Sequence, residues 1–132
     1  MKKKILFVIS EDWYAKSHKF EIIQKAVNLD YITAILFNAN KNEKIFEKNN
    51  IKIYRWNINR YSFNIFRDIS AFFRLIKTIK DFKPDIVQST GIKPNLYISI
   101  VTRLFLNTKF LITFSGLGYL FISNNFLLKS LM

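Results

Sequence analysis

Residues 5–9 read Ile-Leu-Phe-Val-Ile, and this continuous apolar run decides the fold. A strand with one side facing water alternates apolar and polar residues, whereas a strand buried on both faces of a parallel sheet does not. The run therefore predicts the central strand of a parallel sheet. Parallel strands need crossover connections, so helices should alternate with the strands that follow.

The rest of the chain supplies this alternation. Runs rich in β-branched and aromatic residues predict strands, and amphipathic segments between them predict helices. The further predicted strands cover residues 31–37, 51–56 (near a sheet edge), 85–87 and 109–114. The predicted helices cover residues 20–27, a short segment with Asn40 and Glu43 as a capping box, 63–82 and 94–106. The order predicts an α/β fold, a doubly wound, mostly parallel Rossmann-like sheet with helices on both faces.

The longest predicted helix, over residues 63–82, carries one apolar stripe and a set of cations beside it. Pro84 should end this helix, because proline cannot continue it. The predicted core-facing stripe consists of Phe66, Ile69, Phe72, Phe73, Ile76 and Ile79. The cations off the stripe are Arg67, Arg74, Lys77 and Lys80.

Length and composition indicate one folded domain. The chain has 132 residues, half of them hydrophobic and 17% aromatic, which disfavours disorder despite a net charge of +12. We expect residues 1–120 to form the Rossmann-like domain and residues 121–132 to begin a further helix that leads toward another domain.

The basic character leaves several classes of partner open. An excess of Lys and Arg suits nucleic acid, an anionic membrane surface or a phosphorylated substrate, and an AT-rich codon bias also raises the Lys content. The cations are scattered over the predicted helices and form no nucleic-acid-binding motif. We therefore expect an anionic membrane surface, and no nucleic acid, as a partner.

Cysteine is absent, so disulfides and thiolate metal sites are excluded, and no metal site is expected. Three lysines at residues 2–4 precede an apolar run of only five residues, too short for a signal peptide. No apolar stretch reaches the length of about 20 residues that a spanning helix needs. These features favour a cytoplasmic protein. The cations beside the stripe of the 63–82 helix add the expectation of peripheral attachment to an anionic membrane, here the inner face of the plasma membrane.

Polar loops follow three of the predicted strands. In an open parallel sheet, ligands bind beyond the carboxyl ends of the strands, where the winding direction reverses. If the first strand is central, its neighbour across the reversal is the fourth. The loops at residues 10–18, 88–93 and 115–119 should then face one crevice.

The later two loops supply three candidate residues. Lys93 precedes Pro94 at a predicted helix start, where the free N–H groups and the helix dipole favour an anion. The alternative is a solvated lysine beside a proline that only begins the helix. Gly116 and Gly118 permit close approach of a ligand to the backbone, or simply satisfy a tight turn.

The first loop supplies five more candidates for contact with a ligand. Glu11 and Asp12 could bind ligand hydroxyls or serve as a base, although acidic loop residues are most often solvated. Trp13 could stack on a ligand ring, although aromatic residues are most often packing residues. Ser17 and His18 lie at the end of the loop, where a surface or capping role is the alternative for the histidine.

Three segments together carry a resemblance to a known family. The set SEDWY (residues 10–14) with SHKF (17–20), KPDIVQSTGIKPNLY (83–97) and ITFSGLGYLF (112–121) resembles the N-terminal domain of family 4 glycosyltransferases. The resemblance covers nearly the whole chain. It implies the acceptor-binding half of a two-domain GT-B enzyme whose other half, missing here or separately encoded, binds a nucleotide-sugar.

The resemblance also implies a substrate class, and in one place the chain departs from the family pattern. Polyprenyl-diphosphate-linked glycans of O-antigen (lipopolysaccharide) or capsule assembly are the implied acceptors, with no cofactor besides the nucleotide-sugar donor. Many family members carry histidine after the fourth strand, where this chain has Gln88 and Thr90. These two can donate hydrogen bonds to a sugar but cannot act as an imidazole base. The catalytic residues stay unassigned, and the alternative is a non-catalytic remnant or an accessory glycan-binding module.

Overall fold

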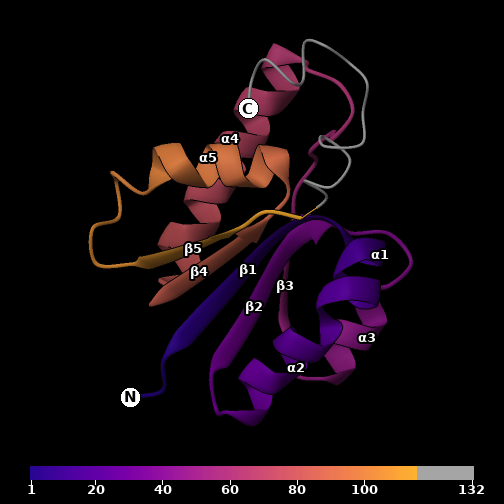
Figure 1. Ribbon diagram of the computed structural model, residues 1–132, viewed down its shortest axis with the longest axis vertical. Coiled ribbons are helices and arrows are strands. Elements are labelled where there is room, and N and C mark those ends of the chain that lie inside the picture. The colour runs from indigo at the N-terminus through magenta and orange to yellow at the C-terminus, as the bar shows by residue number, and fades with distance from the viewer. Residues whose placement is uncertain (116–132) are drawn as a thin grey trace.

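The computed structural model describes residues 1–115, in which five parallel strands form one sheet with helices on both faces (Figure 1). The strands are β1 (Lys4–Glu11), β2 (Ile32–Asn38), β3 (Lys52–Arg55), β4 (Ile86–Thr90) and β5 (Lys109–Thr113). The helices are α1 (Asp12–Tyr14), the π-helical turn η1 (Ala15–Lys19), α2 (Phe20–Asn28), α3 (Glu43–Lys48), α4 (Ile65–Phe82) and α5 (Ile92–Val101).

The order of the strands confirms the predicted winding. It is β3-β2-β1-β4-β5, and every neighbouring pair is parallel. The central strand is β1, which pairs with β2 on one side and with β4 across the reversal on the other. The third strand lies at an edge, as its alternating pattern predicts.

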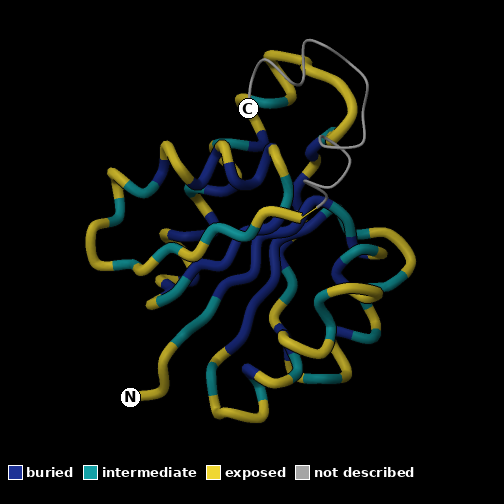
Figure 2. Tube along the Cα trace, in the orientation of Figure 1, coloured by how far each residue is buried: buried dark blue, intermediate teal, exposed yellow. Residues whose placement is uncertain are grey.

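Two hydrophobic cores explain the unbroken apolar run of β1. Leu6 and Val8 pack with α4 and α5 on one face of the sheet, whereas Phe7 and Ile9 pack toward α2 and α3 on the other. Successive side chains of a strand point to opposite faces, so both sets must be apolar. Figure 2 shows the resulting band of buried strands through the middle of the molecule.

Three predicted boundaries are wrong. The fourth strand, predicted over residues 85–87, extends to Thr90, so Gln88 and Thr90 lie in a strand and not in a loop. Residues 12–18, expected as loop, lie in α1 and η1, which continue directly into α2. The predicted helix over residues 94–106 begins two residues earlier and ends at Val101. Pro94 nevertheless lies in the first turn of α5, where its missing N–H costs no helical hydrogen bond.

The predicted capping box of the short helix is also wrong. Helix α3 begins at Glu43 after Asn42, and no side chain of that residue caps it. Instead, the carboxylate of Asp12 accepts hydrogen bonds from the backbone N–H groups of Asn40 and Asn42 at 3.0 and 2.9 Å. The side chain of Glu43 pairs with Arg55 of β3, which lowers the pKa of that carboxyl. A residue distant in sequence thus supplies the acceptor.

The core-facing side of α4 differs from the predicted stripe. Of the six stripe residues, only Ile79 is fully buried, and Phe66, Ile69 and Phe73 are exposed. The buried positions are instead Ala71, Leu75, Thr78, Ile79 and Phe82. Thr78 is tolerated there because its hydroxyl donates to the backbone carbonyl of Arg74 at 2.8 Å. Helix α4 therefore has two apolar sides, and one faces outward.

No helix among residues 1–115 is long and apolar enough to cross a membrane. The helix predicted over residues 121–132 lies outside the described residues, as do Gly116 and Gly118.

Candidate functional site

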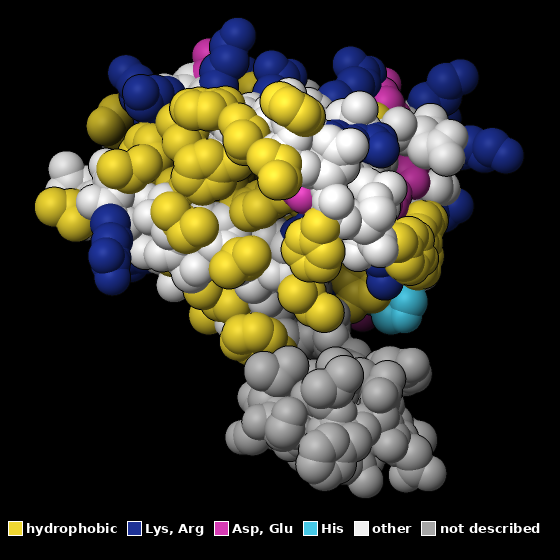
Figure 3. Space-filling view, turned by 90° about the horizontal axis from the view of Figure 1, so that it is seen from above, with side chains coloured by type: hydrophobic (Ala, Val, Ile, Leu, Met, Phe, Trp, Pro, Cys, Tyr) yellow, Lys and Arg dark blue, Asp and Glu magenta, His cyan; other side chains and the backbone are white. Residues whose placement is uncertain are grey.

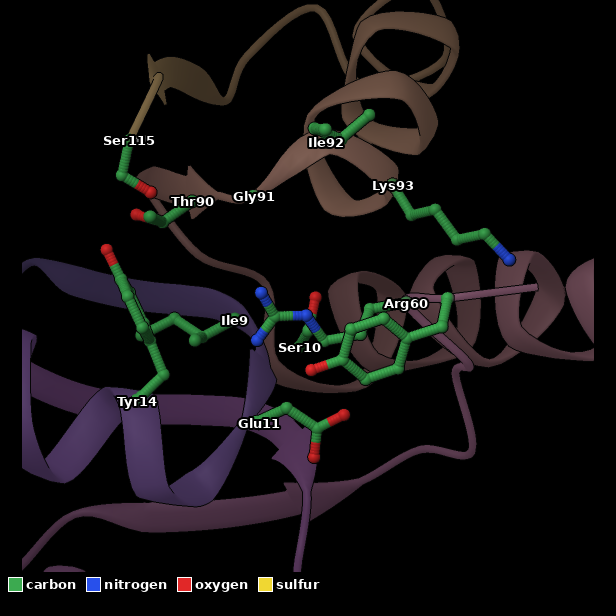
Figure 4. A pocket seen from close by; sticks show the side chains of 11 residues that line it. Ile9, Ser10, Glu11, Tyr14, Arg60, Thr90, Gly91, Ile92, Lys93 and Ser115 are labelled. Atoms are coloured by element: carbon green, nitrogen blue, oxygen red, sulfur yellow. The ribbon is translucent and has the colours of Figure 1, made fainter. Parts of the chain in front are cut away.

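A cavity opens at the carboxyl ends of β1 and β4, where the winding direction of the sheet reverses. Its volume is about 500 Å³. Figure 4 shows its lining, which consists of Ile9, Ser10, Glu11, Tyr14, Arg60, Tyr61, Thr90, Gly91, Ile92, Lys93 and Ser115. The loops after β1, β4 and β5 all contribute, as predicted from the topology rule.

Gly91 makes the junction between β4 and α5 possible. Its φ of +111° is a conformation that side-chain-bearing residues rarely adopt. A Cβ at this position would also lie 3.4 Å from the hydroxyl oxygen of Ser10. The glycine therefore lets the wall after β4 approach the wall after β1.

Hydroxyl groups line the inner part of the cavity. The oxygens of Tyr14, Thr90 and Ser115 are directed to the same side of it in Figure 4. Thr90 is only 3% exposed, and its hydroxyl has no hydrogen-bond partner among residues 1–115. A buried hydroxyl without an internal partner is free to bond with a ligand or with water.

Lys93 lines the cavity with its stem, but its ammonium group is bound elsewhere. The residue is 4% exposed, and Nζ donates to Asp68 Oδ1 at 2.7 Å and to the carbonyl oxygen of Ser62 at 2.6 Å. Figure 4 shows Nζ pointing away from the cavity. Neither the anion site nor the solvated lysine considered from the sequence describes this buried ion pair.

Asp68 is the centre of this group of contacts. Tyr97 donates to Oδ1 at 2.8 Å, and the backbone N–H of Asn64 donates to Oδ2 at 3.1 Å. Burial alone would raise the pKa of Asp68, but the hydrogen bonds from Lys93 and Tyr97 and the lysine charge lower it below its ordinary value. Burial and the contact with Asp68 raise the pKa of Tyr97. We call Ser62, Asn64, Asp68, Lys93 and Tyr97 the Asp68 cluster.

The two acidic candidates have different environments. Asp12 is buried, and its carboxylate is committed to the backbone before α3. Glu11 lines the cavity and accepts a hydrogen bond from Asn38 Nδ2 at 3.2 Å. Of the two carboxylates, Glu11 is therefore the one that a ligand in the cavity can reach.

The remaining candidates after β1 form a small group beside the cavity. The hydroxyl of Ser17 lies 2.6 Å from Nδ1 of His18 and donates to the carbonyl of Trp13 at 2.8 Å. The His18 ring stacks on Tyr14 at a centroid distance of 4.6 Å. None of Trp13, Ser17 and His18 lines the cavity, although Tyr14 does.

The polar residues of β4 and α5 mostly bond to one another and to β5. Gln88 Nε2 lies 3.4 Å from the hydroxyl of Thr113, and Ser89 donates to Asn95 Oδ1 at 2.7 Å. Asn95 in turn donates to the carbonyl of Thr113 at 2.9 Å. These bonds join β4, α5 and β5, and they leave Thr90 as the residue of this strand that faces the cavity.

The segment between β3 and α4 also lines the cavity, a contribution that was not predicted from the sequence. Arg60 and Tyr61 line the cavity, although no loop after the third strand was assigned to it. The same topology rule offers the missing signal, because the carboxyl end of β3 lies at the same edge of the sheet as those of β1 and β4.

The chemistry of the cavity suits a ligand that is both hydroxylated and anionic. Hydroxyl groups and the Glu11 carboxylate can bond with sugar hydroxyls, and Arg60 offers a positive charge. Residues 1–115 contain no group of three His, Cys, Asp or Glu side chains that could hold a metal ion.

Comparison with known families gives one match. The family model described as "Glycosyl transferase 4-like" matches residues 4–132. No curated protein matches the chain significantly.

Solved structures with this fold include several glycosyltransferases. A glycosyltransferase from Rickettsia africae superposes with a TM-score of 0.67 at 23% identity, over 97% of this chain and 35% of the relative. MurG from Acinetobacter baumannii gives a TM-score of 0.60 at 18% identity, over 85% of this chain and 35% of MurG. The glycotransferase of kitacinnamycin gives 0.64 at 7% identity, over 86% of this chain and 30% of the relative.

At these identities the likeness shows the fold alone, a parallel α/β sheet of the kind found in GT-B glycosyltransferases. The chain spans about a third of the length of these relatives, as the coverages of 35, 35 and 30% state.

Proposed function

Because the chain belongs to the glycosyl transferase 4-like family, we propose that it is the acceptor-binding half of a bacterial glycosyltransferase. The proposed acceptor is a polyprenyl-diphosphate-linked glycan, and the proposed donor is a nucleotide-sugar held by a second, donor-binding domain. One observation carries the proposal. Ile92 lines the hydroxyl-rich cavity and is 80% exposed, so the cavity opens beside an outward-facing apolar surface.

That surface consists of the exposed sides of α4 and α5. On α5, Ile92, Leu96 and Ile100 recur at a spacing of four residues and are all exposed. On α4, the exposed apolar residues are Ile65, Phe66, Ile69 and Phe73. Figure 3 shows hydrophobic side chains gathered on the face seen from above. We call these residues of α4 and α5 the apolar face, and a lipid-linked ligand would meet it beside the cavity.

Cations accompany the apolar face. Lys77 follows Ile69 and Phe73 at a spacing of four residues on α4, and both Lys77 and Lys80 are exposed. A cation near an anionic membrane is worth about 1 kcal/mol of attraction. Arg67 and Arg74 bond instead to Asn57 and to the carbonyl of Arg55. We therefore place the apolar face on the inner surface of the plasma membrane, in O-antigen, capsule or related polysaccharide assembly.

The residues of this half would bind and orient the acceptor. Ser10 and Thr90 offer hydroxyls to the sugar, and Glu11 accepts hydrogen bonds from it. Holding the attacking hydroxyl in position removes much of the entropic cost of the reaction. Stabilisation of the departing diphosphate belongs to the donor-binding domain, so no catalytic base is assigned here.

A titration tests the acceptor assignment. Farnesyl-diphosphate-linked N-acetylglucosamine, added to the ¹⁵N-labelled chain, should shift the amide resonances of Ser10, Thr90 and Gly91. Residues Ile22 and Leu29 lie on the other face of the sheet, and their resonances should stay constant. Shifts absent from the cavity would contradict the proposal. Transfer after mixing with a donor domain from a relative would separate an enzyme half from an accessory glycan-binding module.

A matched pair of leucine variants tests the membrane assignment. Leu96 belongs to the apolar face and is 51% exposed, whereas Leu29 ends α2 on the opposite face of the sheet and is 63% exposed. Leu96→Ser should weaken sedimentation with phosphatidylglycerol-containing liposomes, and Leu29→Ser should not. Equal binding of both variants, or equal binding to neutral and anionic liposomes, would argue against this membrane surface.

A further inference from the structure

We propose that Arg60 binds the phosphate oxygens of the ligand in the cavity, a role that the motif after β4 had suggested for Lys93. The inference rests on the proposed function, since it names the residue that recognises the diphosphate of a lipid-linked acceptor. Four observations support it: the charge left uncompensated, the way the segment around Arg60 is held, the stacking of its guanidinium, and the hydroxyls across the cavity.

The first observation is the charge balance of the cavity. Its lining contains two cations, Arg60 and Lys93, and one carboxylate, Glu11. Asp68 neutralises Lys93, whereas Arg60 has no ion pair and donates no hydrogen bond within residues 1–115. Glu11 is bonded to Asn38 and forms no ion pair with Arg60. The positive charge available to a ligand is therefore that of Arg60.

The second observation is that the protein holds the segment around Arg60 on both sides. Before Arg60, the side chain of Asn38 bonds to both the N–H and the carbonyl of Ile58, with the N–H bond at 2.9 Å. After it, Lys93 binds the carbonyl of Ser62. Between them, Asn59 Oδ1 accepts from the N–H groups of Tyr61 and Ser62 at 2.9 and 3.3 Å, which makes a tight turn.

The third observation concerns the guanidinium itself. Its carbon lies 5.7 Å from the ring centroid of Trp13 and 5.0 Å from that of Tyr61. A cation–π attraction to these rings uses no N–H donor of the guanidinium, and those donors have no polar partner among residues 1–115. Those N–H groups form a rigid fork that matches two oxygens of a phosphate. Trp13, a candidate sugar contact, thus acts as a positioning residue for Arg60.

The fourth observation is the hydroxyl group of Thr90. This side chain is nine-tenths buried, has no partner among residues 1–115 and points into the cavity (Figure 4). A hydroxyl can donate to a phosphate oxygen or accept from a sugar hydroxyl. Arg60 on one wall and Thr90 on the other fit a sugar joined to a phosphate or diphosphate.

Binding measurements with charged and neutral probes test this assignment. The probes are farnesyl-diphosphate-linked N-acetylglucosamine, the neutral farnesyl N-acetylglucosaminide, inorganic pyrophosphate and uridine diphosphate. Arg60→Ala should weaken binding of the first probe about ten- to a hundredfold, the loss expected for hydrogen bonds to a charged group. Binding of the neutral glycoside should stay unchanged. Arg60→Lys should recover part of the affinity, because lysine keeps the charge but lacks the fork.

The matched control is Arg103→Ala, which removes the same charge beyond the end of α5, away from the cavity. Its affinity for every probe should equal that of the unchanged chain. If pyrophosphate or uridine diphosphate shows the same Arg60 dependence at higher affinity, Arg60 recognises a free or nucleotide diphosphate and not the lipid-linked one, which supports the phosphate contact and reassigns its source.

Three results would overturn the assignment. Equal losses for the charged and neutral probes would make Arg60 a general part of the cavity wall. Equal losses of affinity in Arg60→Ala and Arg103→Ala would mean that the loss comes from the net charge of the chain and not from a contact of Arg60. Unchanged affinity of Arg60→Ala for the charged probe would rule out the phosphate contact, and the proposed acceptor function would stand without it. If the unchanged chain binds neither glycoside, the proposed function itself fails.

Discussion

The two polar walls of the cavity are built in opposite ways. On the side formed by β4 and α5, Lys93 of the lining is bonded to Asp68. Behind it, Ser89 is bonded to Asn95, which donates to the carbonyl of Thr113. In the segment between β3 and α4, the ends are held but Arg60 at the turn has no polar partner within residues 1–115. The wall that carries the recognisable motif is therefore mainly structural, and the segment without a motif presents the charge.

The contrast between the two walls explains why residue type alone does not identify the cation that is available to a ligand. A lysine before a helix is expected to bind an anion, but the carboxylate of Asp68, from another helix, reaches Lys93 first. A buried ion pair holds elements in register, whereas an unpaired cation at a cavity attracts ligands. If the two walls differ in this way, substitutions at the Asp68 cluster should change the unfolding free energy, and substitution of Arg60 should change ligand affinity.

The largest expected effect follows from breaking the Asp68 cluster. Lys93→Met removes the cation and leaves the carboxylate of Asp68 without its ion-pair partner. Loss of one partner of a buried pair costs about 3 kcal/mol or more of unfolding free energy. Urea unfolding followed by circular dichroism would measure it. Adding Asp68→Asn to Lys93→Met should restore part of the lost unfolding free energy. If Asp68→Asn costs the same unfolding free energy in the unchanged chain and in Lys93→Met, the two side chains are not coupled.

A smaller effect is expected from releasing the segment before Arg60. Asn38→Ala leaves the N–H and the carbonyl of the buried Ile58 without their partners. The expected cost is about 2 kcal/mol, since unsatisfied buried polar groups cost about 1–3 kcal/mol each. The same variant should also weaken binding of the diphosphate probe, because Arg60 loses its fixed position. A stable Asn38→Ala chain with full affinity would contradict the role given to this anchor.

Acid should weaken the Asp68 cluster further. The pKa of Asp68 is lower in the folded chain than its ordinary value of about 3.9, so the unfolded chain takes up the proton more readily. The stabilisation is present above that value and is lost as the pH falls through it toward the lower folded pKa. Glu43 and Asp81 have lowered pKa values too, so the unfolding free energy of Asp68→Asn should fall less steeply between about pH 5 and pH 2, not become flat. If the unfolding free energy of Asp68→Asn falls with pH as steeply as that of the unchanged chain, the Asp68 carboxylate does not stabilise the fold in this way.

The smallest effect on stability is expected where the effect on binding is largest. Arg60→Ala removes an exposed side chain without a polar partner in residues 1–115 and loses only two cation–π contacts, so its unfolding free energy should fall by only about 1 kcal/mol. Thermal unfolding of this variant beside Lys93→Met measures the contrast directly. If Arg60→Ala proves as destabilising as Lys93→Met, the two walls do not differ in the way described.

Local patterns were sufficient for the architecture of the sheet. The unbroken run of β1, the alternation of β3 and the proline after α4 each predicted the correct element, because burial on one or two faces leaves a direct mark on residue order. The same patterns predicted the position of the cavity, since the carboxyl ends of parallel strands lie at one edge of the sheet. The glycosyltransferase family was recognisable from three short segments.

Only the tertiary structure decided which side of α4 faces the core and which polar residues face the cavity. Helix α4 has two apolar sides, and periodicity cannot rank them when neighbouring elements choose between them. Lys93 and Asp68 are 25 residues apart in sequence, and Asp12 binds the backbone N–H of Asn42, 30 residues away, so no local pattern could pair them. Such contacts form between elements that the fold brings together, and they determine which charge remains for a ligand. The sequence thus determined where the cavity lies, and the three-dimensional pairing of charges left Arg60 as its cation without an ion pair among residues 1–115.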